Sequence, residues 1–382
     1  MRNAKKDVAL FVMLTVTFVF VPSCRAQVAT DERKNETNAA RDGVVSAIRS
    51  MTARRAAHTA TLLGNGKVLI AGGFVSNGGG LSSAELFDPT TNTFASAENM
   101  IAARAGHTAT LLPNGKVLIS GGYNSGYLNS AEVYDPDTNR FASAGRMVTA
   151  RSGHVAALLN DGKILLAGGV GTGWTFLADA ELFDPQTNTF TTTGGMRTAR
   201  ESHTATLLNN GKVLVIGGHS GRRPSVMIHS SAEIYDPATR TFTAAGNMTR
   251  VRHKHEATLL TDGRVLIAGG SDERDGRGAY TSAEIYNPTT GTFAATGNMN
   301  AARYKLQGTS VLLNDGKVLI AGGANRAEIF DPVTNTFSYA SGSLGTTRLF
   351  ATATRLRNGQ VLITGGYDDS NAVSSNAWIY RA

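Results

Sequence analysis

The chain has 382 residues, of which 41% are hydrophobic and 43 are glycine, and its formal net charge is +8. This composition supplies ample apolar surface for a large core and suits a fold with many tight turns. The positive charge is mild for this length, and the absence of a block of basic residues argues against nucleic-acid binding. Cys24 is the single cysteine, so an intramolecular disulfide is excluded.

Residues 1–26 predict an export signal. Arg2, Lys5 and Lys6 give a positive start, an apolar run extends from Val8 to Val21, and the segment ends on the small residue Ala26. A run of about fourteen apolar residues is short for a membrane span, so we expect none in the mature chain. An uncleaved N-terminal anchor is the alternative interpretation.

The segment Val21-Pro22-Ser23-Cys24 also resembles a bacterial lipoprotein cleavage box, which makes a lipid anchor on Cys24 an alternative to cleavage after Ala26. Residues 27–42 are polar and lack periodicity, which predicts a flexible tether. We therefore expect an exported protein, periplasmic or extracellular, whose folded domain spans residues 43–382.

A short apolar run that ends in two glycines occurs seven times. Successive pairs lie 43 to 53 residues apart, a period typical of solenoids, arrays and propellers. Each run reads as a strand buried on both faces, and the glycines indicate a close backbone approach that a Cβ would block. The pairs are Gly72 and Gly73, Gly121 and Gly122, Gly168 and Gly169, Gly217 and Gly218, Gly269 and Gly270, Gly322 and Gly323, and Gly365 and Gly366.

Each repeat predicts four strands, which we denote a, b, c and d. In the first repeat, residues 55–63 form strand a and residues 67–73 form strand b, joined by the hairpin dipeptide Asn65-Gly66. Asn-Gly or Asp-Gly occurs at this place in all seven repeats and predicts a type I′ turn. Residues 83–89 form strand c, and residues 91–94 lead into strand d. Four antiparallel strands repeated around a ring describe the blades of a β-propeller.

The repeated elements resemble kelch repeats. They are the glycine pair, the run Glu-Leu-Phe-Asp-Pro at 85–89, Thr-x-Thr-Phe at 91–94 and the lead-in Met-x-x-Ala-Arg-x-x-His at 100–107. The likeness covers about residues 43–382 and is strongest to the bacterial form also seen in the central domain of galactose oxidase. It implies an all-β, seven-bladed kelch β-propeller with four antiparallel strands per blade. Phenylalanine stands where many kelch repeats have tryptophan.

The two ends of the chain predict how the ring closes. The seventh repeat supplies strands a, b and c and then ends, so it lacks strand d, whereas residues 44–51 resemble a strand d without a blade. We expect this N-terminal strand to complete the last blade, because pairing removes an exposed sheet edge.

Polar residues also repeat, and their repetition favours a structural role, since a ring has many equivalent joints. A histidine (58, 107, 154, 203, 255) lies fourteen residues before a glycine pair, and an arginine three residues before that position. The repeated glutamates of strand c should bond backbone or this arginine at a blade joint, because a buried carboxylate needs partners. The sixth repeat departs, with Lys305 at the arginine place and Gly308 at the histidine place, and the seventh has Ala351 and, for the glutamate, Trp378. The glutamates are Glu85, Glu132, Glu181, Glu233, Glu284 and Glu328.

Sequence diversity is confined to the b–c loops and d–a links, which should share one face, here called the variable face. Variable loops on a rigid scaffold are where binding usually resides. Arginine beside aromatic residues is typical of interface anchors, although long solvated loops are the alternative interpretation. His253 and His255 alternate on one strand, but we expect no metal there. The candidate ligand-binding residues are His219, Arg222, Arg223, His229, Arg250, His253, Lys254, Asp272, Arg274, Arg277, Tyr280, Trp174 and Tyr127.

These features favour a monomeric binding module for a protein or glycan, with no cofactor and no catalytic residues. A carbohydrate isomerase or lyase acting in the central mouth is the alternative, and a scaffold role is a third. A copper-radical oxidase of the galactose oxidase type needs a cysteine cross-linked to tyrosine, and residues 27–382 contain no cysteine.

Overall fold

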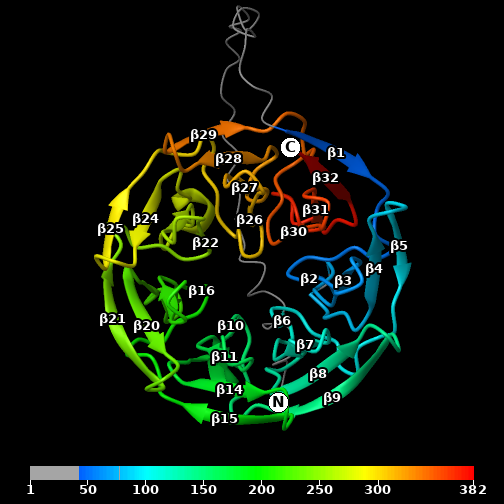
Figure 1. The fold of residues 1–382 in the computed structure, drawn as a ribbon, viewed down its shortest axis with the longest axis horizontal. Coiled ribbons are helices and arrows are strands. Elements are labelled where there is room, and N and C mark those ends of the chain that lie inside the picture. Colours follow the sequence, from blue (N-terminus) through cyan, green and yellow to red (C-terminus); the bar gives the residue numbers. More distant parts are fainter. Residues whose placement is uncertain (1–42, 77) are drawn as a thin grey trace, which may run out of the picture.

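The computed structural model describes residues 43–76 and 78–382. The expected signal (1–26), tether (27–42) and Cys24 lie outside the described residues. Within them, seven four-stranded antiparallel sheets follow one another around a ring, which confirms the seven-bladed all-β fold (Figure 1). Strands a surround the centre and strands d form the rim.

The first four blades contain the following strands. Blade 1 has β2 (Thr59–Leu62), β3 (Val68–Ala71), β4 (Ala84–Asp88) and β5 (Thr93–Ser96). Blade 2 has β6 (Thr108–Leu111), β7 (Val117–Ser120), β8 (Ser130–Asp135) and β9 (Arg140–Arg146). Blade 3 has β10 (Val155–Leu158), β11 (Ile164–Ala167), β14 (Ala180–Asp184) and β15 (Thr189–Thr193). Blade 4 has β16 (Thr204–Leu207), β17 (Val213–Ile216), β20 (Ser231–Asp236) and β21 (Thr241–Asn247).

The remaining blades follow the same order. Blade 5 has β22 (Glu256–Leu259), β23 (Val265–Ala268), β24 (Ala283–Asn287) and β25 (Thr292–Ala295). Blade 6 has β26 (Ser310–Leu312), β27 (Val318–Ile320), β28 (Glu328–Asp331) and β29 (Thr336–Tyr339). Blade 7 has β30 (Thr352–Arg355), β31 (Val361–Thr364), β32 (Ala377–Arg381) and, from the other end of the chain, β1 (Val44–Ile48).

The core lies between neighbouring blades. Strand b is buried along its whole length in every blade because its two faces contact different neighbours. In blade 1, Val68 and Ile70 pack against Leu362 of blade 7, while Leu69 packs against Val117 of blade 2. The continuous apolar runs are therefore sandwiched strands.

The hairpins between strands a and b form, but they are not type I′ turns. In blade 1 the Gly66 N–H donates to the Leu63 carbonyl (3.0 Å), and the Lys67 N–H donates to the Asn65 side chain (3.1 Å). Only the glycine has a positive φ (84°). This is a three-residue loop that ends in a left-handed glycine. The Asn65 side-chain oxygen accepts the N–H of the residue two positions later. Aspartate has the same oxygen, so asparagine and aspartate both stabilise this turn.

The glycine pairs mark a close approach between blades. Gly72 and Gly73 have φ values of 62° and 97°, and a Cβ on Gly72 would lie 2.6 Å from the Arg104 carbonyl oxygen of the next blade. A Cβ on Gly73 would lie 2.7 Å from the Ala56 carbonyl oxygen. Only glycine combines this conformation with this proximity. The second glycine of each other pair also has a positive φ, and a Cβ there would lie 2.6 to 2.9 Å from its nearest neighbour; these glycines are Gly122, Gly169, Gly218, Gly270, Gly323 and Gly366.

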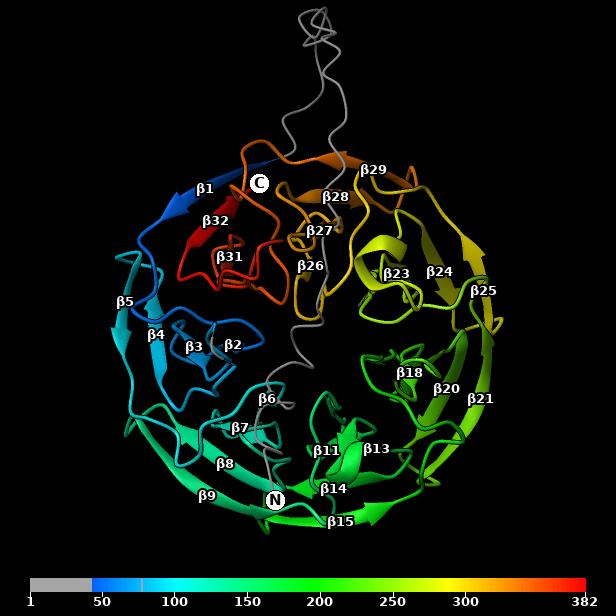
Figure 2. The same ribbon diagram turned by 180° about the vertical axis from the view of Figure 1, so that it is seen from behind.

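The N-terminal strand closes the ring as predicted. β1 pairs with β32 along its full length, from Val44 opposite Arg381 to Ile48 opposite Ala377. Figures 1 and 2 both show β1 on the rim outside β32. Val45 N–H also donates to the Ser341 carbonyl of blade 6 (2.9 Å), so this strand joins two blades.

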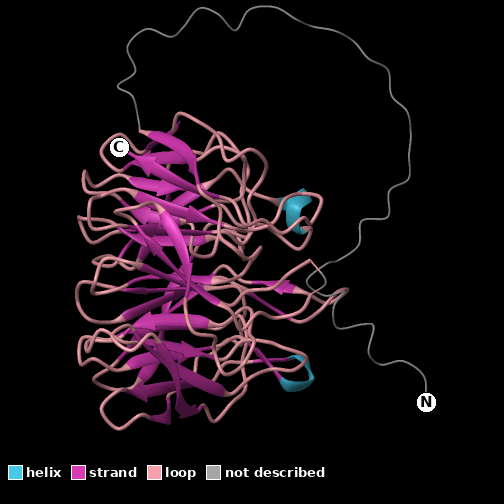
Figure 3. Cartoon of the chain, turned by 90° about the vertical axis from the view of Figure 1, so that its right-hand side faces the viewer, coloured by secondary structure: helices cyan, strands magenta, loops and turns pink. Residues whose placement is uncertain are grey.

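The two faces of the ring differ in their loops. The longest loops project from one face, together with η2 (Thr172–Trp174) and η3 (Asp275–Gly278) (Figure 3). Two small ribbons extend these loops, formed by β12 (Val170–Gly171) with β13 (Thr175–Phe176) and by β18 (His219–Ser220) with β19 (Met227–Ile228). This is the variable face. In the part of the chain that the structure describes, no helix is long and apolar enough for a membrane crossing.

Candidate functional site

The repeated arginine and glutamate form a buried clamp in each of the first six blades. In blade 1 an Arg55 guanidinium nitrogen lies 2.8 Å from Glu85 Oε1, and both side chains are almost completely buried. Arg55 also donates to the Gly72 carbonyl, and Glu85 accepts the Thr52 N–H of the incoming link (2.7 Å). The clamp thus fixes the link between two blades, so these residues serve the architecture.

Blade 6 corrects the register assumed from the sequence. The clamp there uses Arg303, which lies 2.8 Å from Glu328, and not Lys305. Leu306 occupies the histidine place, because its side chain stands beside Gly269 as His107 does beside Gly72. Two extra residues therefore separate this link from its glycine pair. In blade 7, Arg348 stacks over Trp378, its guanidinium carbon 5.0 Å from the ring centroid.

The repeated histidines join neighbouring blades through hydroxyl groups. The Nε2 atoms of His107, His154 and His255 each lie 3.1 Å from the threonine hydroxyl that opens strand a of the preceding blade. Burial lowers the pKa of His107 to about 3, so its ring is neutral at physiological pH. His203 lacks such a partner because Val155 stands at the threonine place.

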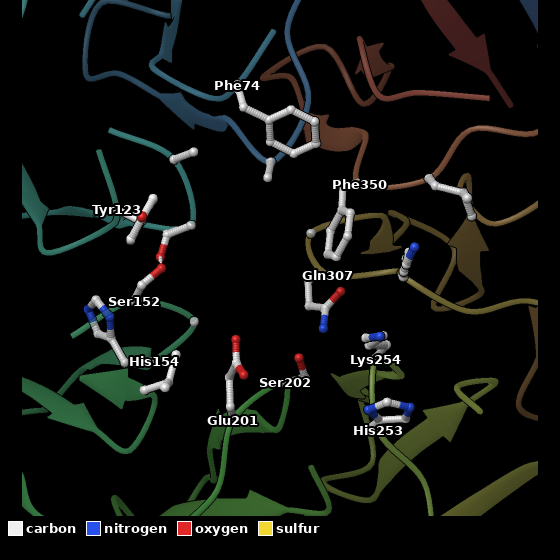
Figure 4. A pocket seen from close by; sticks show the side chains of 18 of the residues that line it. Phe74, Tyr123, Ser152, His154, Glu201, Ser202, His253, Lys254, Gln307 and Phe350 are labelled. Carbon is white, nitrogen blue, oxygen red and sulfur yellow. Dashed lines mark hydrogen bonds between the residues drawn. The ribbon is translucent and has the colours of Figure 1, made fainter. Parts of the chain in front are cut away.

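A cavity of about 2510 Å³ opens at the centre of the variable face. It is lined by b–c loops, d–a links and the starts of the strands a, and Figure 4 shows side chains from several blades around it. The residue two positions after the repeated arginine, which is Arg303 in blade 6 and Arg348 in blade 7, lines the cavity in every blade and adopts a positive φ. These residues are Ala57, Gly106, Gly153, Ser202, Lys254, Lys305 and Phe350.

This link position forms a ring of seven residues whose size changes around the cavity. Blades 1 to 4 carry small residues there, whereas blades 5 to 7 carry Lys254, Lys305 and Phe350, with φ between 51° and 56°. A large residue in this conformation costs about 1–3 kcal/mol and occurs mainly where function retains it. The three larger link residues come from consecutive blades and line one side of the cavity.

Aromatic rings form a shelf on the wall contributed by blades 2 to 4. The Tyr127 ring lies edge-on to Tyr123 (centroids 5.3 Å apart) and to Trp174 (5.8 Å). The Arg222 guanidinium carbon stands 4.3 Å from the centroid of the Trp174 ring. We call these four residues the aromatic shelf.

Titratable side chains of blades 4 and 5 form a connected cluster beside the shelf. His219 Nε2 lies 3.6 Å from Glu201 Oε2, and His219 Nδ1 lies 3.2 Å from His253 Nδ1. His253 Nε2 lies 3.4 Å from Asp275 Oδ1, which also accepts the Lys254 ammonium at 2.5 Å. We call these five residues the histidine–carboxylate cluster.

The two carboxyl groups of this cluster have pKa values that are shifted in opposite directions. Burial raises the pKa of Glu201 to about 7, although 24% of its side-chain surface is accessible. Figure 4 shows this carboxylate pointing into the cavity. For Asp275 burial acts in the same direction, but His253 and Lys254 outweigh it and hold the pKa well below its usual range. Burial lowers the pKa of His219 to about 3, so the ring is neutral. The cluster therefore offers a carboxyl that can give or take a proton near neutral pH.

The structure gathers nine of the thirteen predicted ligand-binding residues on the cavity wall. They are His219, Arg222, Arg223, His253, Lys254, Arg274, Arg277, Trp174 and Tyr127.

The other four predicted residues do not line the cavity. His229 is buried, with its Nε2 3.1 Å from the Ser220 hydroxyl. Tyr280 lies beneath Arg250, whose guanidinium carbon is 5.6 Å from the ring centroid. Asp272 binds Arg274 (2.5 Å) and sets the loop that carries η3. These residues support the loops around the mouth.

Sequence reasoning missed Glu201, Lys305 and Tyr367, which all line the cavity, as Tyr304 does. Glu201 precedes the variable link position and could have been found by comparing that position across repeats. The two-residue insertion caused Lys305 to be aligned with the repeated arginine, although Arg303 occupies that position. The described residues hold no group of three or more His, Cys, Asp or Glu side chains suited to a metal ion. His255 instead bonds Thr204, while His253 faces His219.

Seven radial four-stranded sheets with an open central mouth define a seven-bladed β-propeller. The model of the kelch motif matches residues 55–101, 103–148, 151–197 and 202–249. Since the other blades repeat the same strands, glycine pairs and turns, the chain is a kelch-repeat protein.

The structure is similar to that of a fungal alcohol oxidase of the AA5 family, solved in complex with copper. The TM-score is 0.72 at 17% sequence identity, and the alignment covers 88% of this chain and 76% of that one. At this identity the likeness shows the fold alone. No curated protein matches the sequence.

Proposed function

We propose that this kelch propeller is an exported binding protein whose ligand is a carbohydrate chain seated in the central cavity. The observation that carries the proposal is the aromatic shelf beside a balanced set of polar side chains. Six cationic and six acidic side chains line the cavity. A sugar presents C–H faces that stack on aromatic rings and hydroxyls that bond both donors and acceptors, so it suits such a wall better than a strongly charged ligand.

The size of the cavity supports a ligand longer than a monosaccharide. About 2510 Å³ exceeds the roughly 300–1,000 Å³ of ordinary small-molecule pockets. An oligosaccharide, or a glycan carried by a protein, fits this space and still reaches both the shelf and the link residues.

A glycan array probed with the full chain, followed by calorimetric titration of the best glycan, tests this proposal. Trp174→Ala should weaken binding at least about tenfold, because it removes the stacking surface. Tyr339→Ala is the matched control: Arg326 stands 4.2 Å from that ring centroid, but the pair lies at the rim. Unchanged affinity for Trp174→Ala, or equal loss in both variants, would refute the shelf as the binding surface.

A second candidate function is acid–base catalysis on the bound sugar, of isomerase or lyase type. The specific observation is Glu201, whose carboxyl faces the cavity with a pKa of about 7 and contacts a neutral histidine. A general acid or base is most effective near the working pH. Proton NMR of array-positive sugars incubated with the protein would reveal conversion. Glu201→Gln should abolish conversion while keeping affinity, whereas conversion by Glu201→Gln equal to wild type would exclude this role.

A further inference from the structure

Six of the seven lysines in residues 43–76 and 78–382 pair with an aspartate. The Nζ to carboxylate distances run from 2.5 to 3.8 Å, and the pairs are Lys67–Asp88, Lys116–Asp135, Lys163–Asp184, Lys212–Asp236, Lys254–Asp275 and Lys317–Asp331. Lys305 is the exception among the described lysines, since no carboxylate lies within 4.0 Å of its Nζ.

Lys305 instead stands among three aromatic rings on the cavity wall. Its Nζ lies 5.1 Å from the ring centroid of Tyr304, 5.7 Å from that of Phe350 and 5.2 Å from that of Tyr367. Its hydrogen-bonding partner is the Tyr367 hydroxyl, at 2.5 Å. We call these four residues the lysine cage.

The lysine cage removes water from an amine that remains open to the cavity. Burial lowers the pKa of Lys305 to about 8, and the nearby Lys254 charge acts in the same direction. An amine desolvated by apolar surroundings and placed near a second cation is the arrangement that activates lysine as a nucleophile. The surface lysines have solvent and an aspartate, both of which favour the unreactive ammonium.

We propose that Lys305 is a nucleophilic amine that forms an imine with an aldehyde entering the cavity, such as the open-chain reducing end of a carbohydrate. This inference rests on the proposed carbohydrate function and identifies the end of the ligand that reaches blade 6. The three rings also favour the product, because their faces attract the cationic imine that forms when the neutral imine takes up a proton from water.

The reaction balances without an oxidant or a cofactor. The Lys305 nitrogen attacks the carbonyl carbon, forms the C–N bond and passes one proton to the carbonyl oxygen, giving a carbinolamine. The C–O bond then breaks, and the oxygen leaves as water with the second nitrogen proton as the C=N bond forms. Burial raises the pKa of Tyr367, so its hydroxyl stays protonated and can relay these protons.

Lys254 is a matched control within the same cavity. It occupies the equivalent link position in blade 5, with φ 55° against 56° for Lys305, but it is paired with Asp275. The two lysines therefore share backbone conformation and cavity, and differ in their partners.

The test is reductive trapping of the full chain with glycolaldehyde and sodium cyanoborohydride at pH 8, followed by peptide mass mapping. Lys305 should acquire the adduct at least about tenfold faster than Lys254, because burial lowers the pKa of Lys305 to about 8, whereas the Lys254 amine is held in an ion pair with Asp275. Tyr367→Phe, which keeps the ring, should slow trapping at Lys305, and Lys305→Met should leave no preferred lysine.

Equal rates at Lys305 and Lys254, or a preferred adduct that persists in Lys305→Met, would overturn the inference. If Tyr367→Phe melts at the wild-type temperature, a lower trapping rate at Lys305 comes from the lost hydroxyl and not from unfolding. If Lys305 in this variant is trapped at the wild-type rate, the proton relay is refuted. Calorimetric binding of a methyl glycoside, which has no aldehyde, tests the proposed carbohydrate function separately. If the methyl glycoside binds but glycolaldehyde gives no preferred adduct at Lys305, this inference fails while the proposed carbohydrate function stands.

Discussion

The joint between blades 3 and 4 allows a substitution that should stabilise the protein. His203 is 3% exposed, and its Nε2 has no hydrogen-bond partner within the described residues. The equivalent histidines of other joints bond a threonine hydroxyl at about 3.1 Å. Val155→Thr places that hydroxyl at the equivalent site, with the same branched shape and the same strand geometry.

The magnitude follows from the value of one buried hydrogen bond. A neutral bond contributes a net ~1 kcal/mol, and leaving a buried polar atom unsatisfied costs about 1–3 kcal/mol. Because the domain is large, a gain of ~1 kcal/mol corresponds to a rise of about 1–2 °C in the melting temperature. Thr59→Val, the reverse change at the joint between blades 1 and 2, should lower it by a similar amount, because the Thr59 hydroxyl bonds His107 there.

Differential scanning calorimetry at neutral pH measures both shifts. The decisive comparison is a double-mutant cycle with His203→Leu, a residue that blade 6 carries at this place as Leu306. With leucine opposite, Val155→Thr buries a hydroxyl without its partner and should destabilise the protein. If it stabilises both backgrounds equally, the gain does not come from the threonine–histidine bond.

Three further predictions concern closure, the clamp and pH. A chain that begins at residue 52 lacks β1 and should melt about 5 °C or more below a chain that begins at residue 43, because blade 7 then has an exposed edge; equal melting would mean that β1 is dispensable. Glu181→Gln should destabilise the protein by about 1–3 kcal/mol in chemical denaturation without abolishing ligand binding, since Glu181 accepts bonds from Arg151 and the Val148 N–H; loss of binding at unchanged stability would contradict the structural role. Burial raises the pKa of Glu256 to about 8. Between pH 4.5 and 8 the folded state therefore binds more protons than the unfolded state. As a result, the contribution of Glu256 to the free energy of unfolding falls as the pH rises through this range. Glu256→Gln, which keeps an acceptor for the Gly308 N–H, should therefore raise the melting temperature at pH 8 and leave it unchanged near pH 4; an equal effect at both values would exclude titration as the cause.

The architecture could be predicted from the sequence because each blade is specified by local signals. The glycine pairs, the Asn-Gly or Asp-Gly turns and the sandwiched apolar runs repeat with a constant strand order, and the missing fourth strand of blade 7 matches the spare strand at residues 44–51. The turn type was wrong, because the same dipeptides suit a three-residue loop with one left-handed glycine as well as a type I′ turn.

The site could be predicted only in part, since most of it depends on register and on neighbours in the ring. A two-residue insertion moved Lys305 from the clamp position to the cavity wall, next to rings from blade 7. Glu201 gained its raised pKa from burial inside the ring, which no local pattern encodes.

The sequence by itself determined the number of blades, their strands and the closing strand, because hydrophobic period, turn residues and repetition act over short stretches of chain. Only the tertiary structure decided which variable side chains meet. The closed ring brings the links of blades 4 to 7 around one cavity, where distance, burial and neighbouring charges set the chemistry of His219, Asp275 and Lys305. Those quantities depend on residues from different blades, such as Lys305 and Tyr367, which lie 62 positions apart in the chain, so they arise only when the blades pack into the ring.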